Sequence, residues 1–231
     1  MMSETLIFYT NPMSRGQTVR WMLEEIGQPY ETEILTYGGT MKSPEYLAIN
    51  PMGKVPAIKH GDTVITECGA ILAYLADAFP DAGLAPAIDD PRRGAYYRWL
   101  FFGAGCVEGT ASAAAIGIKE LDERQQGIAG FGSMQQVIDT LDKALSTPQP
   151  YLTGDTFTAA DLYIGSQLAW LTRFGVFEKR ASFVSYIARV TSREAAKRAH
   201  QIDEDLIARN PELIPEVWLM AIPNRRSLPS T

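Results

Sequence analysis

The chain has 231 residues, of which 46% are hydrophobic, enough for one large domain or two of ordinary size with a buried core. Its formal net charge of −6, from 21 basic and 27 acidic residues, argues against a nucleic-acid partner, because phosphate binding needs a basic face. The start of the chain has no secretory signal pattern, and no stretch is long and apolar enough to span a membrane. We therefore expect a soluble cytoplasmic protein with no membrane partner.

The few cysteines and histidines exclude disulfide-stabilised and metal-binding classes of protein. Cys68 and Cys106 are the only cysteines, too few and too widely separated for a disulfide scaffold or a structural zinc site. His60 and His200 are likewise too few for a metal cluster. We therefore expect no metal.

The first predicted elements are a short strand and a helix joined by a tight loop. Residues 6–9 form an apolar run of strand length. A helical stripe follows, formed by Val19, Met22, Leu23 and Ile26. Arg20 and Glu24 are predicted on the other side of this helix, and Gly27 stands where a C-terminal cap belongs.

The loop before this helix ends at Ser14. Such a loop brings a side chain and several unpaired backbone N–H groups to one point, which suits an anion. Gln17 follows Ser14 at the spacing of a capping box, so the hydroxyl could instead only cap the helix. The stretch alone leaves both interpretations open. It lacks the Gly-x-Ser-x-Gly elbow, which argues against a Ser-His-Asp hydrolase.

Further strands complete a small α/β unit. Residues 30–35 alternate as a strand, and residues 55–58 form another after a short helix. Pro56 has no backbone N–H to donate to a neighbouring strand. It is therefore expected at a sheet edge, at a β-bulge or after a cis peptide bond. Residues 63–66 return as a hairpin partner, and a helix covers residues 67–79. The first strand pair is expected to be parallel and the last to be a hairpin.

The chain divides into two predicted domains. The α/β unit occupies residues 1–80, and residues 81–90, rich in Asp, Ala, Gly and Pro, form a linker. Residues 91–208 show helical patterns and no strong strand pattern, which predicts an all-helical bundle. Residues 209–231 form a tail, of which residues 211–222 are expected to clasp the domain through apolar side chains.

Three separated motifs carry a resemblance to a known family. They are the strand with the Ser14 loop, the segment NPMGKVP at residues 50–56 followed by Thr66-Glu67-Cys68, and the segment FTAADL at residues 157–162. In this order and spacing the chain resembles the cytosolic glutathione S-transferases, with a bacterial-type, serine-type active-site loop, over roughly residues 4–208. The resemblance implies a thioredoxin-like α/β N-terminal domain followed by an all-α C-terminal helical bundle, and a homodimer.

The resemblance also implies the activity, which is attack of glutathione, held as a thiolate co-substrate, on a small hydrophobic electrophile. Val55 would bond the cysteinyl part of glutathione through its backbone, and Pro56 would be cis. Glu67 and Cys68 would hold the γ-glutamyl end at the start of their helix, where free N–H groups favour a carboxylate. The family commonly has Ser where this chain has Cys68. Two cations are candidates for the tripeptide's carboxylates, or else solvated surface charges: Arg15 and Lys54.

Ser14 is the expected catalytic residue, because the family's serine-type members use a residue at the matching position. Tyr9 and Thr10 are the alternatives, since tyrosine-type members place their hydroxyl near the end of this strand. The residues expected to line the substrate pocket are Met13, Phe101, Phe102 and Cys106. The two phenylalanines could instead belong to the core of the bundle. Thr158 and Asp161 look like the family's N-capping box, with a role in folding.

The sequence leaves two alternatives open, one for the role of Cys68 and one for the type of activity. Cys68 at a helix start could have a lowered pKa and form a mixed disulfide with glutathione, or it could be a small buried residue in the place of a serine. The chain could also be a glutathione-dependent disulfide or peroxide reductase, or a non-catalytic transferase-like binding or regulatory module.

Overall fold

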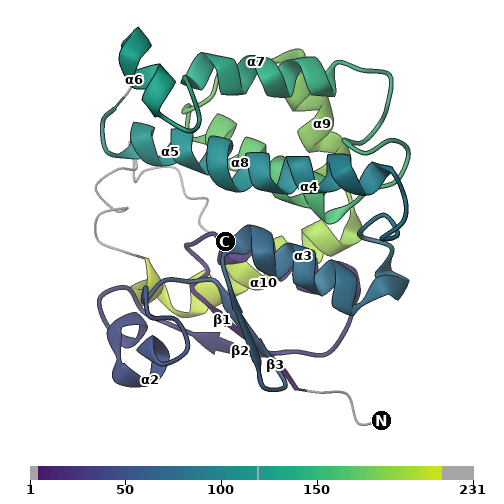
Figure 1. The fold of residues 1–231 in the computed structure, drawn as a ribbon. Helices are drawn as coiled ribbons and strands as arrows, with labels where there is room; N and C mark the ends of the chain where they lie inside the picture. The colour runs from purple at the N-terminus through teal and green to yellow at the C-terminus, as the bar shows by residue number, and fades with distance from the viewer. Residues whose placement is uncertain (1–4, 119, 215–231) are drawn as a thin grey trace.

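The computed structural model describes residues 5–118 and 120–214 (Figure 1). Its N-terminal part is a four-stranded mixed sheet in the order β2-β1-β3-β4. The strands are β1 (Leu6–Thr10), β2 (Glu31–Ile34), β3 (Ala57–His60) and β4 (Thr63–Thr66). β1 pairs parallel with β2 and antiparallel with β3, and β3 and β4 form a hairpin. This confirms the predicted parallel first pair and terminal hairpin of a thioredoxin-like unit.

Helices α1 (Gly16–Ile26) and α3 (Cys68–Ala78) pack on the sheet face that carries Leu6 and Phe8. The predicted stripe of α1 is buried, and Gly27 caps the helix in the left-handed conformation at φ 66°, as expected. The opposite face of the sheet carries a smaller cluster beside α2 (Pro44–Leu47), and its members are Leu35, Met41, Tyr46 and Ala57.

The C-terminal part is mostly helical, as predicted. Its helices are α4 (Arg92–Phe102), α5 (Glu108–Ala115), α6 (Glu123–Ile128), α7 (Met134–Leu145), α8 (Ala159–Arg173), α9 (Ala181–Thr191) and α10 (Glu194–Arg209). A π-helical turn, Gly103–Val107, joins α4 to α5, so the two run as one helix. Short 3₁₀ turns cover Thr40–Lys42, Pro80–Ala82 and Pro211–Leu213. The π-helical turn and α6 were not predicted, because neither changes the apolar pattern of the sequence.

Helix α8 is the centre of this part and is buried over most of its length. The predicted capping box at its start is confirmed: the Asp161 carboxylate accepts hydrogen bonds from the Thr158 backbone N–H at 2.9 Å and the Thr158 hydroxyl at 2.8 Å. The same carboxylate accepts from the Leu152 N–H and the Tyr186 hydroxyl, each at 2.8 Å. These four bonds fix the helix at its N-terminus and so fix the side chains that it presents further along.

Helix α10 returns to the N-terminal part and packs against α1. Figure 1 shows it running between the sheet and the other helices. Because of this contact Arg20 lies at 1% exposure and faces inward, so its predicted position on the side of α1 away from the apolar stripe does not leave it in solvent. Sequence periodicity shows only the stripe that meets the sheet, and α1 is covered on a second side as well.

In the part of the chain that the structure describes, no helix is long and apolar enough to cross a lipid bilayer. The clasp predicted for residues 211–222 lies mostly outside the described residues. The domain boundaries set at residues 80 and 90 stay predictions.

Candidate active site

The Ser14 loop is held by its own hydrogen bonds at the carboxyl end of β1. The Ser14 hydroxyl donates to the Asn11 carbonyl at 2.7 Å and accepts from the Gly16 N–H at 2.9 Å. The buried Asn11 side chain donates to the Leu35 carbonyl at 2.8 Å and accepts from the Met13 N–H at 2.9 Å. These bonds fix the position of the Ser14 side chain at the N-terminus of α1.

The capping box predicted from Ser14 and Gln17 is not formed. Gln17 donates through Nε2 to the Pro12 carbonyl at 2.6 Å, and α1 has no side-chain cap in the usual sense. Ser14 nevertheless satisfies the N–H of Gly16, the first residue of α1, so its hydroxyl has a structural role in addition to any chemical one.

Of the two alternative hydroxyls, that of Thr10 lies close to this point, beneath the loop, and that of Tyr9 lies away from it. Thr10 is buried at 1% exposure beneath the loop, where a Cβ at position 16 would collide with its Oγ1, so the close approach requires Gly16. Tyr9 lies on the opposite face of the sheet, with its ring 5.7 Å from that of Tyr46. Burial raises the pKa of the Tyr9 hydroxyl, and the charge of Glu33 raises it further.

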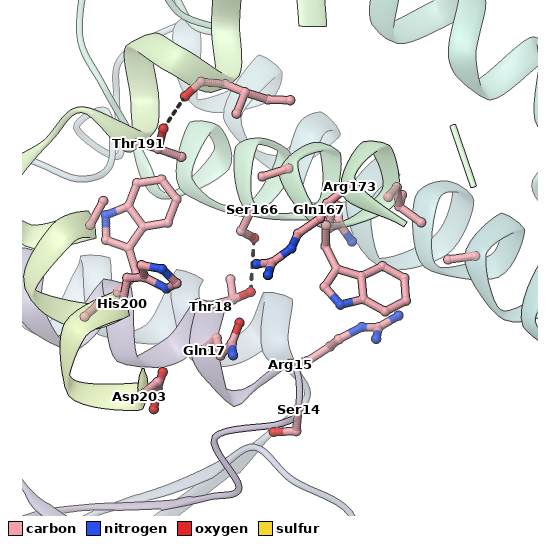
Figure 2. Close-up of a pocket in the computed structure, with 18 of the residues that line it drawn as sticks. Ser14, Arg15, Gln17, Thr18, Ser166, Gln167, Arg173, Thr191, His200 and Asp203 are labelled. Atoms are coloured by element: carbon pink, nitrogen blue, oxygen red, sulfur yellow. Dashed lines mark hydrogen bonds between the residues drawn. The ribbon is translucent and has the colours of Figure 1, made fainter. Parts of the chain in front are cut away.

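A cavity of about 500 Å³ opens beside Ser14, between α1 and the helical part (Figure 2). Its N-terminal wall is made by the first turns of α1, and its other walls come mainly from α8 and α10. The hydroxyls of Thr18 on α1 and Ser166 on α8 lie 3.0 Å apart and connect the two helices within the cavity wall (Figure 2). Trp21 and Trp170 supply aromatic surface. The cavity therefore combines one reactive-loop hydroxyl with a mainly apolar chamber.

Arg15 crosses one side of this cavity to the helical part. Its Nε and Nη2 lie 3.2 Å from the two carboxylate oxygens of Glu108, and its guanidinium lies 4.5 Å from the centre of the Trp170 ring. Gln167 donates to Glu108 at 3.2 Å and to the Gly103 carbonyl at 3.0 Å. The Gly103 carbonyl, in the π-helical turn, thus helps to hold Gln167, and Gln167 in turn holds Glu108.

Arg20 and Asp203 form a second connection, deeper in the same region. The Arg20 Nε donates to the Asp203 carboxylate at 2.7 Å, and the two side chains are 1% and 3% exposed. Burial raises the pKa of Asp203 to about 6, against the opposing effect of Arg20. The Arg20 Nη2 is buried and finds no hydrogen-bond partner among the described residues.

The residues assigned to glutathione lie on the loops around the sheet end. The Val55–Pro56 bond is cis, as the resemblance implied. Glu67 is exposed and directly precedes α3 at φ 67°, the only non-glycine residue with a positive φ in the described part of the chain. Lys54 is exposed, and its carbonyl accepts hydrogen bonds from neighbouring side chains.

Cys68 does not have the lowered pKa that would favour a mixed disulfide. Burial raises the pKa of its thiol, and the charges of Glu108 and Glu67 raise it further, although Arg15 opposes them. The sulfur lies 3.9 Å from the Arg15 carbonyl oxygen, towards α1. The position of Cys68 at the start of α3 therefore does not lower the pKa of its thiol, because desolvation raises that pKa by more than the helix N-terminus can lower it.

Four residues expected in the substrate pocket are not among those that line this cavity. Phe101 is 74% exposed on α4, and Phe102 packs on Trp99 at 5.5 Å. Cys106 lies in the π-helical turn, and Met13 contacts Tyr37, whose hydroxyl donates to the Met13 carbonyl at 3.1 Å. The spacing of the aromatic residues on α4 indicates a helix that packs in the core. It does not indicate which helices line the cavity beside Ser14.

Several site residues were missed. The sequence shows Trp170, Gln167 and Ser166 only as part of a buried helix, and their direction depends on how α8 packs. Tyr37 stands in a loop with no distinctive pattern, yet burial raises the pKa of its hydroxyl against the opposing charge of Arg15. Only the tertiary contacts reveal these residues.

Comparisons with known proteins identify a family with this fold. The family model described as "Glutathione S-transferase, N-terminal domain" matches residues 8–83. Glutathione S-transferase GST-4.5 of Xanthomonas campestris is 30% identical over 173 residues, covering 73% of this chain and 83% of that protein.

Solved structures show the same similarity. A glutathione transferase from Methylococcus capsulatus superposes with a TM-score of 0.73 at 28% identity, covering 87% of this chain and 99% of that one. A glutathione transferase homologue from Sulfitobacter, solved with bound glutathione, gives a TM-score of 0.66 at 26% identity, covering 85% and 97%. The fold, the loop at the end of β1 and these similarities together show that the chain belongs to the glutathione S-transferase family.

Proposed function

We propose that Ser14 donates a hydrogen bond to the thiolate of bound glutathione, and that this sulfur attacks a small electrophile held in the adjacent cavity. The observation that carries the proposal is the position of Ser14, which lies at the start of α1 and also lines the cavity of about 500 Å³. Neither Tyr9 nor Thr10 lines that cavity. A sulfur beside Ser14 would therefore face both the helix N-terminus and the electrophile.

The energy required is modest. A free thiol has a pKa of about 8.5, and lowering it by about two units takes about 2.7 kcal/mol. A hydrogen bond to a charged group contributes about 1.5–3 kcal/mol, and a helix N-terminus contributes about 0.3–1 kcal/mol. No general base is needed for this ionisation.

The existing hydrogen bonds of Ser14 set a condition on this mechanism. A hydroxyl has one proton, and here it is donated to the Asn11 carbonyl at 2.7 Å. The hydroxyl must turn from that carbonyl to the sulfur, while its oxygen can continue to accept from the Gly16 N–H. The net stabilisation of the thiolate is thus smaller than that of a hydroxyl with no prior partner.

We assign the rest of glutathione to the loops beside Ser14. The Val55 backbone would bond the cysteinyl part, and Glu67 with the free N–H groups at the start of α3 would hold the γ-glutamyl end. The positive φ of Glu67 supports this assignment, because residues held in sparsely populated backbone regions cluster at ligand-binding sites. Lys54 is exposed and can approach a carboxylate, whereas Arg15 already shares its charge with Glu108.

We also propose a cytoplasmic homodimer. Two large apolar side chains support the dimer, because Met52 and Phe101 are 66% and 74% exposed, and exposed apolar surface is typical of protein interfaces. Analytical ultracentrifugation tests this proposal. A wild-type monomer at micromolar concentration would contradict it, and Phe101→Asp should weaken the dimer.

Two other activities use the same site. A disulfide or peroxide reductase would also depend on the glutathione thiolate, and a binding module would bind glutathione without turnover. Calorimetric titration with glutathione, followed by assays with chlorodinitrobenzene and hydroxyethyl disulfide, distinguishes the three. Conjugation supports the transferase, reduction of the disulfide alone supports the reductase, and binding without either reaction supports the module.

The Ser14→Ala variant tests the assigned role directly. We expect the pKa of the bound thiol, followed by the ultraviolet absorbance of the thiolate, to rise by about one to two units, since one charge-assisted hydrogen bond is lost. The rate at neutral pH should fall by a similar factor, about 10- to 100-fold, and recover at higher pH. Ser14→Thr keeps a hydroxyl and serves as the control. Unchanged thiol pKa and rate in a folded Ser14→Ala variant would assign the role to another group.

A further inference from the structure

Arg173 lies at the last turn of α8 and lines the cavity. It is seven residues beyond Ser166, which places the two on one face of the helix, and helical side chains point back towards the N-terminus. Figure 2 shows the Arg173 side chain extending over the cavity towards Ser166. The guanidinium is therefore presented to whatever occupies the chamber beside Ser14.

The carboxylates that line the cavity are already paired with other arginines. Glu108 lies 3.2 Å from the Arg15 guanidinium, and Asp203 lies 2.7 Å from that of Arg20. Each of these anions is therefore neutralised by a cation that is not Arg173.

Arg173 itself has no carboxylate partner within residues 5–118 and 120–214. Its guanidinium lies 6.0 Å from the centre of the Phe174 ring, a contact that does not neutralise its charge. Lys197 on α10 is the remaining lysine or arginine among the described residues that line the cavity, and it pairs with Glu194 at 2.7 Å in an exposed and weak ion pair. The chain carries a net charge of −6, yet the described residues that line this chamber include three cations, Arg15, Arg173 and Lys197, against two carboxylates, Glu108 and Asp203.

The remaining walls favour an apolar body for the occupant. Trp21 and Trp170 line the chamber together with Leu171, Ile187 and several alanines. An apolar or aromatic ring can bury surface against these side chains.

We infer that the electrophile carries an anionic group, such as a carboxylate, on an aromatic or apolar body, and that Arg173 binds this group. The inference rests on the proposed function of the Ser14 site. With a halogenated nitrobenzoate, the glutathione sulfur would form a carbon–sulfur bond to the ring, and the halide would leave with the bonding electron pair. The thiol proton goes to solvent on ionisation, so no oxidant or reductant is needed.

A matched pair of substrates tests the inference. Chlorodinitrobenzoate and chlorodinitrobenzene share a leaving group and differ in one carboxylate. We expect Arg173→Gln to lower kcat/KM for the benzoate about 10-fold, mainly through KM, and to change that for the neutral compound less than 2-fold, because an arginine–carboxylate hydrogen bond is charge-assisted. Arg173→Lys should restore part of the loss. Arg124→Gln removes an exposed arginine on α6 outside the cavity and should leave both substrates unchanged.

Binding provides a readout that does not depend on turnover. Dinitrobenzoate has no leaving group and should quench tryptophan fluorescence, because Trp21 and Trp170 line the cavity. If the neutral substrate is not conjugated but Arg173→Gln weakens dinitrobenzoate binding about 10-fold, the proposed transferase reaction fails and the anion site stands. If Arg173→Gln changes neither dinitrobenzoate binding nor the preference for the benzoate, the inference is wrong.

Discussion

Arg15 and Glu108 join the two parts of the chain across the candidate active site, with two nitrogen–oxygen distances of 3.2 Å between residues 93 positions apart. Arg15 directly follows the proposed catalytic Ser14, and Glu108 directly follows the π-helical turn. The guanidinium also lies against Trp170. The loop that carries Ser14 is therefore positioned by the helical part as well as by the sheet.

The first prediction concerns the strength of this connection. The Arg15 and Glu108 side chains are 38% and 24% exposed, so solvent screens the pair, and Glu108→Gln should lower the free energy of unfolding by less than about 1 kcal/mol. Arg15→Leu also loses the contact with Trp170 and should cost about 1–2 kcal/mol. Urea unfolding at low and high salt measures both. A loss above about 2 kcal/mol in Glu108→Gln that persists at high salt would show that the pair behaves as a buried one.

The second prediction concerns Arg20 and Asp203, which are almost fully buried. Removal of one partner leaves an uncompensated buried charge, so Arg20→Met and Asp203→Leu should each cost about 3–5 kcal/mol. The double variant should cost much less than the sum, because both charges are then gone. Lys197→Ala at the exposed pair with Glu194 is the matched control and should cost less than about 1 kcal/mol. If the free energy of unfolding lost by the double variant equals the sum of the two single losses, Arg20 and Asp203 are not energetically coupled.

The third prediction is a pH dependence. The folded-state pKa of Asp203 is raised to about 6 from an ordinary value of 3.8, so the native state binds a proton in this window that the unfolded state does not. Its contribution to stability is therefore full below about pH 4 and is lost as the pH rises to about 6, by up to about 3 kcal/mol. The difference in unfolding free energy between wild type and Asp203→Asn should follow this course. A difference that grows with pH would mean that Arg20 lowers the pKa of Asp203 instead.

Local signals were enough to predict much of the fold. The Gly27 cap and the hairpin at β3 and β4 were predicted from short-range patterns, because each depends on residues close in sequence. The capping box at Asp161 was implied by the family resemblance. The direction of Arg20 could not be predicted in this way, since it depends on Asp203 of α10, which is 183 positions further along the chain.

The candidate site was predicted only in part. A strand, a loop and a helix start coincide at Ser14, but only the family resemblance favoured a catalytic role for it, and that role stays a prediction. The walls of the cavity could not be predicted, because Trp170 and Arg173 face it only through the packing of α8 against α1. Phe101 was also not placed by the sequence: the family resemblance suggested a pocket residue and its spacing on α4 a core residue, whereas the structure leaves it exposed.

The last prediction concerns Cys68, which replaces the serine that the family commonly has. Burial raises the pKa of this thiol, and Glu108 and Glu67 add to the effect, so we expect slow alkylation by iodoacetamide in the folded protein and fast alkylation in urea. Intact-mass measurement of a Cys106→Ser variant after exposure to oxidised glutathione should show no adduct.

Substitution at Cys68 separates packing from reactivity. The sulfur approaches the Arg15 carbonyl at 3.9 Å, and a hydroxyl in its place can donate to the same oxygen, so Cys68→Ser should keep activity within about 3-fold. Cys68→Ala removes that donor and the bulk of the sulfur, and should lower stability more than Cys68→Ser does. A glutathione adduct on Cys68 that a reductant removes would show that the thiol is reactive despite its burial, and that opening at the start of α3 exposes it.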